Sequence, residues 1–164
     1  MRERIWSELT QARHSLEFAI LYLGRQRIKQ RIFNILVLLF SSSGILGWQI
    51  WNNFPYVVCI IISIVSLVRL IQPYIIMGEK QIMSLDDIHK FYFDYYNRLE
   101  KLWFDFESSR IDEAIAAEKF YELKNSEGGI NSTVNEIIRS QPKEIVAKAK
   151  MHTESYLKIV FKTQ

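Results

Sequence analysis

Among the polar or charged residues that interrupt two long apolar runs of this chain, seven have types and spacing that could do chemistry. Such groups are costly in lipid, so they usually face protein or water. At 100° per residue, the polar residues of each run gather on one side of a helix. Facing inward in an assembly of several copies, they would line a polar path for ions. The predicted pore-lining residues are Asn34, Ser41, Ser42, Gln49, Ser63, Ser66 and Arg69.

Local hydrogen bonding is an alternative use of these groups. A serine hydroxyl can donate to a backbone carbonyl of its own helix or to a neighbouring helix. For the serines, pore lining and such bonds are about equally good explanations. Asn34, Gln49 and Arg69 lie near the ends of the runs, where solvation at an interface explains them equally well.

Patterns typical of an enzyme are absent from the sequence. His14, His89 and His152 stand far apart, and none has a second ligand at metal-binding spacing. The pair Gly128-Gly129 lacks the Lys and Ser/Thr of a phosphate-binding loop. We therefore predict that the protein is not an enzyme and needs no metal or other cofactor.

The polar residues must be positioned by the two apolar runs, Ile32–Trp51 and Pro55–Ile76. A helix of ~20 residues spans the ~30 Å hydrocarbon core of a bilayer. A buried pair of soluble helices is the less favoured alternative, because soluble helices rarely stay apolar all round for five turns. Ser43 and Gly47 form a small-residue pair predicted to allow close helix packing. The sequence thus predicts a two-helix transmembrane hairpin over residues 32–76.

Charge is distributed unevenly around this hairpin. Residues 1–31 carry seven Arg or Lys against three Glu, whereas residues 77–164 carry thirteen basic and fifteen acidic residues. Cytoplasmic flanks collect Lys and Arg, so both termini are predicted on the cytoplasmic side. A basic run before the first span would fix this orientation and could also contact anionic lipid headgroups. Its members are Arg25, Arg27, Lys29 and Arg31.

The flanking residues have the periodicity of helices and show no strand pattern, so the predicted fold class is all-α. An amphipathic helix is expected over Glu3–Leu23, with Gly24 loosening the chain after it. Residues 77–164 are expected to form a cytoplasmic helical bundle. Its expected parts are a helix over Ser84–Glu107 opened by a capping box, a helix over Ile111–Asn125, a loop at Ser126–Gly129, a short helix over Asn131–Arg139, and a last helix from Ser140 and Pro142 to Phe161.

The predicted helix Ser84–Glu107 carries apolar and aromatic residues on more than one face. A helix of this kind needs neighbours, from the same chain or from another copy. The sequence leaves these two arrangements open. The residues predicted to mediate oligomerisation or partner binding are Tyr92, Tyr95, Leu99, Leu102, Trp103 and Phe106.

This order of elements resembles the SLATT family of small bacterial proteins with two transmembrane helices. The resemblance also rests on Trp6, the pattern around Arg13, the short turn at Asn52-Asn53 and the Tyr-rich helix after the second run. It implies a pore-forming or membrane-disrupting effector of the bacterial inner membrane, acting in a defence system that halts infected cells. A regulatory partner or a nucleotide signal would then act on the cytoplasmic helices.

Two functions follow as hypotheses. The first is an oligomeric effector that opens a pore in the inner membrane and is gated through its cytoplasmic helices. The alternative is a membrane-anchored scaffold whose helices recruit a soluble partner. The expected partners are a lipid bilayer and further copies of the chain, and no nucleic acid.

Overall fold

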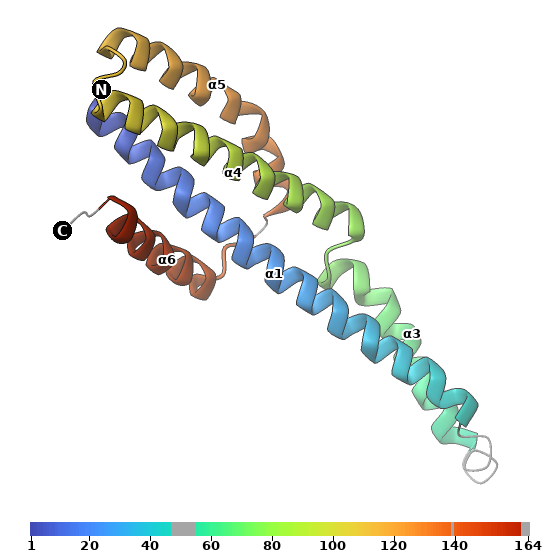
Figure 1. Ribbon diagram of the computed structural model, residues 1–164. Coiled ribbons are helices and arrows are strands. Elements are labelled where there is room, and N and C mark those ends of the chain that lie inside the picture. Colours follow the sequence, from blue (N-terminus) through green and yellow to red (C-terminus); the bar gives the residue numbers. More distant parts are fainter. Residues whose placement is uncertain (47–54, 139, 162–164) are drawn as a thin grey trace. The chain divides into compact units, whose positions relative to one another are not determined.

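The computed structural model describes residues 1–46, 55–138 and 140–161, with the side chains at 40–46, 55, 57, 58, 61, 73 and 75 left outside this description. Within these ranges the chain forms helices and no strand, which confirms the predicted all-helical class. The helices are α1 (Arg2–Leu46), α3 (Pro55–Ile75), α4 (Glu79–Glu107), α5 (Glu113–Ile137) and α6 (Lys143–Phe161) (Figure 1).

Contacts between residues divide the chain into two units. Unit 1 comprises residues 1–23 and 83–164, and so combines the first half of α1 with α5, α6 and most of α4. Unit 2 comprises residues 24–82, which include the second half of α1 and the whole of α3. The two ends of the sequence therefore belong to the same unit.

Unit 1 is built around the apolar face of the first half of α1. Ile5, Leu9 and Leu16 recur at the predicted helical spacing and are at most 2% exposed. Each such side chain contributes ~1.5–3 kcal/mol when it is fully buried. Three alanines on three different helices, which let backbones approach closely, are also at most 2% exposed: Ala12, Ala116 and Ala149.

Glycine does not interrupt the helices as predicted. Helix α1 continues through Gly24, and α5 continues through Gly128 and Gly129, so the predicted loop at Ser126–Gly129 is wrong. A glycine inside a helix costs only ~1 kcal/mol relative to alanine, and packing can offset that amount. In α5 the buried side chains of Phe120 and Ile137 lie on either side of the glycine pair.

Two helix starts illustrate how local hydrogen bonds set boundaries. Helix α4 begins at Glu79, five residues before the predicted capping box at Ser84, and the backbone N–H of Gly78 donates to Oε1 of Gln81 over 3.1 Å. Helix α6 begins directly after Pro142, as the sequence predicts, because Pro lacks the N–H that a helix start leaves unused.

The prediction of an inner-membrane protein is overturned by the helices themselves. Within the part of the chain that the structure describes, none of the helices is both long and apolar enough to cross a membrane. In α3, the polar residues Ser63, Ser66 and Arg69 interrupt the apolar sequence.

Candidate functional site

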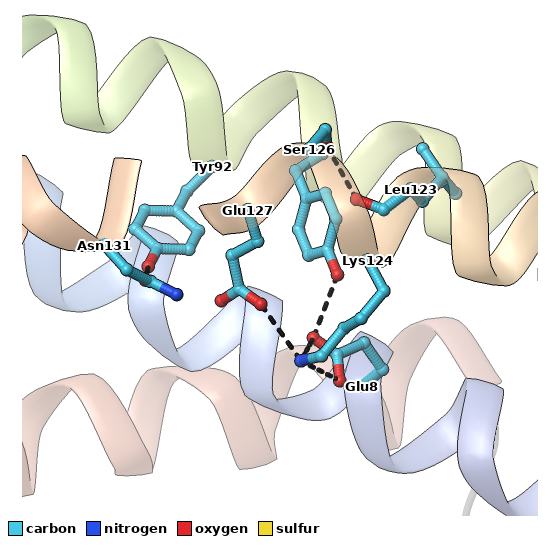
Figure 2. A network of polar contacts seen from close by, with 8 residues as sticks. Glu8, Tyr92, Leu123, Lys124, Ser126, Glu127 and Asn131 are labelled. Atoms are coloured by element: carbon cyan, nitrogen blue, oxygen red, sulfur yellow. Dashed lines mark hydrogen bonds and ion pairs between the residues drawn. The ribbon is translucent and has the colours of Figure 1, made fainter. Parts of the chain in front are cut away.

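A polar network in unit 1 joins α1, α4 and α5 around Glu8 (Figure 2). The ammonium group of Lys124 donates to both carboxylate oxygens of Glu8, each over 2.8 Å, and to Oε2 of Glu127 over 2.9 Å. The hydroxyl of Tyr95 donates to Oε1 of Glu8 over 2.9 Å. Glu8 and Glu127 are buried, so these bonds replace the water that both carboxylates lose.

The titration behaviour of this network follows from its burial and pairing. Burial raises the pKa of the Tyr95 hydroxyl, and its hydrogen bond to the Glu8 carboxylate raises this pKa further. Partial burial acts to lower the pKa of Lys124, but its hydrogen bonds to Glu8 and Glu127 outweigh that effect and raise the pKa. The network therefore stays with a neutral tyrosine and a charged lysine over the ordinary pH range.

Sequence reasoning missed this network, although a signal was present. Glu8 lies between Ile5 and Ala12 on the apolar stripe of α1, where a charged residue calls for a partner. Lys124 and Glu127 are three residues apart, the spacing of an ion pair on one helix face. We interpret the network as a device that fixes how α1, α4 and α5 pack, because the bonds to Glu8 join α1 to both of the other helices.

A second cluster surrounds Arg13 on the side of α1 that faces α6. Its Nη2 lies 2.5 Å from Oε1 of Glu17, and its guanidinium carbon lies 3.8 Å from the ring centroid of Tyr156. Nδ1 of His152 lies 3.4 Å from Oε2 of Glu17. Nε of Arg13 is buried and has no hydrogen-bond partner among the atoms that the structure describes. The aromatic faces above the guanidinium compensate part of that loss.

The residues predicted to contact a partner lie largely in the core of unit 1. Leu99 is fully buried, and Tyr92, Tyr95, Leu102 and Trp103 are at most 9% exposed. Phe106 is half-buried. The structure thus assigns these side chains to packing within one chain.

Those predicted pore-lining residues whose side chains the structure describes belong to unit 2. Asn34, Ser63, Ser66 and Arg69 are exposed. The Ser63 hydroxyl donates to the backbone oxygen of Cys59 and the Ser66 hydroxyl to that of Ile62, each over 2.8 Å, which is the local bonding that the sequence left as an alternative.

Other predicted residues of unit 2 can be placed only in part. Gln49 and Gly47 lie outside the described residues, as do the side chains of Ser41, Ser42 and Ser43. The residues predicted to contact lipid headgroups are exposed along the second half of α1: Arg25, Arg27, Lys29 and Arg31.

The main feature of unit 2 is exposed apolar surface. Helix α3 exposes large apolar side chains around most of its circumference, and Leu70 is 72% exposed. The second half of α1 adds further exposed apolar residues, with Leu38 at 68%. Contiguous exposed apolar surface of this kind marks an interaction site. The residues on α3 are Tyr56, Ile60, Ile62, Ile64, Leu67, Val68, Leu70, Ile71 and Tyr74.

The described side chains offer no metal centre. They contain no group of three or more His, Cys, Asp or Glu residues placed to hold a metal ion. Burial lowers the pKa of His14, and the nearby positive charge of Lys150 lowers it further, so His14 stays neutral at pH 7.

Comparison with known proteins supplies no relative: no protein-family model, curated protein or solved structure matches this chain. The resemblance to the SLATT family therefore stays a prediction.

Proposed function

We propose that this protein is a self-assembling helical scaffold in which unit 2 joins copies of the chain. The observation that carries the proposal is the apolar surface of α3. Its exposed positions include Ile64, Leu67 and Ile71, which share one side of the helix, and Ile62, which lies on another. In water, a surface that is apolar on several sides requires cover from another molecule.

The energy available from this surface is sufficient for stable association. Burying one exposed Leu or Ile contributes ~1.5–3 kcal/mol. Association costs ~4–15 kcal/mol in lost translational and rotational freedom. At the upper end of that cost, about five to ten such side chains offset it. Helix α3 alone exposes Ile60, Ile62, Ile64, Leu67, Val68, Leu70 and Ile71.

A second copy of the chain is the occupant that the charges favour. Arg69 is the one charged residue in the α3 sequence, so the surface offers little charge for selecting a partner of opposite sign. An apolar surface is complementary to itself, and most soluble oligomers are symmetric assemblies of one chain. Unit 1 has its own core, so each copy would present that unit to a partner.

This proposal retains the oligomer of the first hypothesis and the scaffold of the alternative, and it does not include a membrane. The predicted pore depends on an inner-membrane location, which the described helices contradict. It is therefore not part of the proposed function.

Sedimentation velocity of the full chain tests the proposal. We expect the wild type to sediment as an oligomer and the double variant Ile64→Glu, Leu67→Glu to sediment as a smaller species, because two buried carboxylates would oppose association. The matched control Met151→Glu, Ile159→Glu changes two exposed apolar residues of α6 in unit 1 and should leave the oligomer intact. A monomeric wild type, or equal sedimentation of both double variants, would contradict the proposal.

A further inference from the structure

A cavity of about 600 Å³ opens at one end of unit 1, where α1 begins and α4 and α6 end. This volume is within the range of ~300–1,000 Å³ that is typical of ligand sites. Trp103 is the one residue of the lining that the sequence analysis predicted as a site residue. The lining residues are Arg2, Glu3, Trp6, Trp103, Phe104, Glu107, Val160 and Phe161.

Four aromatic rings from three helices form the apolar part of the cavity. The ring of Trp6 lies 5.0 Å from that of Trp103 and 5.1 Å from that of Phe161, measured between centroids. Phe104 stacks on Phe161 with a centroid distance of 5.6 Å. Aromatic faces carry negative potential and attract cations, and Trp does so most strongly.

A cation of the chain itself already lies on this surface. The guanidinium carbon of Arg2 is 5.8 Å from the Trp103 ring centroid, and its Nε lies 2.6 Å from Oε1 of Glu107. The Arg2 side chain is 67% exposed, so it lies over the cavity and remains largely in contact with solvent. Within a single chain, the cavity thus already holds a guanidinium group against a tryptophan ring and beside a carboxylate.

The charges around the cavity leave room for a second cation. Glu107 is paired with Arg2, whereas Glu3 adds a further carboxylate to the lining. The C-terminal ends of α4 and α6 contribute partial negative charge here, against the partial positive charge at the N-terminal end of α1. The balance of side chains and helix ends is therefore negative.

We propose that this cavity binds a cationic side chain, an arginine or lysine presented by a partner protein. The aliphatic part of that side chain would lie on Phe104 and Val160, and its charged group would lie over Trp6 near Glu3. Arg2 competes for the same aromatic surface. This site lies in unit 1, so the inference does not depend on the proposed self-association.

Fluorine NMR of the full chain labelled with 5-fluorotryptophan tests the site. The probe is the peptide Ac-Gly-Arg-Gly-NH₂, and its control is the same peptide with citrulline, which has nearly the same shape without the charge. We expect the arginine peptide to shift the resonances of Trp6 and Trp103, identified by Trp→Phe substitution, with the Trp48 and Trp51 resonances unmoved. Equal shifts by both peptides, or no shift by either, would overturn the proposal.

Substitutions at two exposed positions distinguish a binding site from an aromatic cluster that serves packing alone. Arg2→Gln removes the competing cation and should tighten binding of the arginine peptide about two- to fivefold. Glu3→Gln removes a carboxylate and should weaken it by a similar factor, and Glu122→Gln on the exposed surface of α5 is the control. If the aromatic cluster serves packing alone, neither substitution changes the peptide's affinity, and that result would overturn the proposal.

Discussion

Leu99 on α4 is completely buried, whereas Leu67 on α3 is 56% exposed, although both are leucines within long helices. The same contrast holds for their units. Of the 23 buried apolar residues that the structure describes, 22 lie in unit 1 and one, Ile82, lies in unit 2. Unit 1 has parts of four helices that cover one another's apolar faces, whereas unit 2 has essentially two. Two helices can cover only one side of each other, so the remaining apolar sides need another molecule.

Truncating one leucine in each unit tests this contrast with the largest expected effect. Leu99→Ala should lower the free energy of unfolding by ~2–5 kcal/mol, because it leaves a cavity in a packed core. Leu67→Ala should change the unfolding of unit 1 by no more than ~0.5 kcal/mol. Urea denaturation followed by near-ultraviolet circular dichroism reports the buried aromatic residues of unit 1. Similar losses for both variants would contradict the contrast.

Removing the charge at the centre of the polar network should have the next largest effect. Glu8→Gln weakens the bonds from Lys124 and Tyr95, so we expect a loss of ~1–3 kcal/mol in the free energy of unfolding. The partial exposure of Lys124 places the result toward the lower end, since water can solvate its ammonium group. Glu122→Gln, at an exposed position of the same helix as Lys124, should change stability by ~0.5 kcal/mol or less.

Alkaline pH should destabilise unit 1 through its buried tyrosines. The pKa of Tyr95 is raised in the folded chain, so above pH ~10 the unfolded chain loses a proton that the folded chain keeps. The free energy of unfolding then falls with rising pH, by up to ~1.4 kcal/mol per pH unit for one such group. Tyr95→Phe should make this fall less steep between pH 10 and 11. An unchanged slope would show that Tyr95 ionises equally in both states.

Replacing a helical glycine should have the smallest effect, and it should be stabilising. A methyl group at Gly128 would meet no atom within 4 Å, and the residue lies inside α5. Gly128→Ala should therefore raise the free energy of unfolding by ~0.4–1 kcal/mol, because it restricts the unfolded chain. A higher thermal midpoint in circular dichroism would agree. A lower midpoint would show that α5 needs glycine at this position.

The sequence predicted the elements of unit 1 better than their boundaries. Spacing of apolar residues located the buried face of α1, because burial of Ile5, Leu9 and Leu16 requires that spacing. Gly24 and Gly128 were misleading because their local cost is small beside the packing of the helices around them. Position along the sequence also gave no indication that Glu8 would meet Lys124, since such a long-range pair depends on how the helices pack.

The binding surfaces were harder to predict than the fold. Tyr95 and Leu99 were predicted to mediate oligomerisation or partner binding, although the sequence left open whether their neighbours belong to the same chain or to another copy. The structure shows both side chains in the core of unit 1. The aromatic cavity combines residues near both ends of the sequence, Trp6 and Phe161, so no local pattern could reveal it. The apolar runs of unit 2 were recognised from sequence, but none of the helices in the described part of the chain is long and apolar enough for the predicted membrane crossing.

The exposed Cys59 on α3 offers the most direct test of whether a second copy covers unit 2. It is the single cysteine of the sequence, so a dipolar interaction between two spin labels attached to it can arise only between two chains. We predict a defined distance between the labels in double electron–electron resonance of the full chain, lost on dilution with an excess of unlabelled protein. Labels that show no dipolar interaction, in a sample without unlabelled protein, would contradict self-assembly through α3.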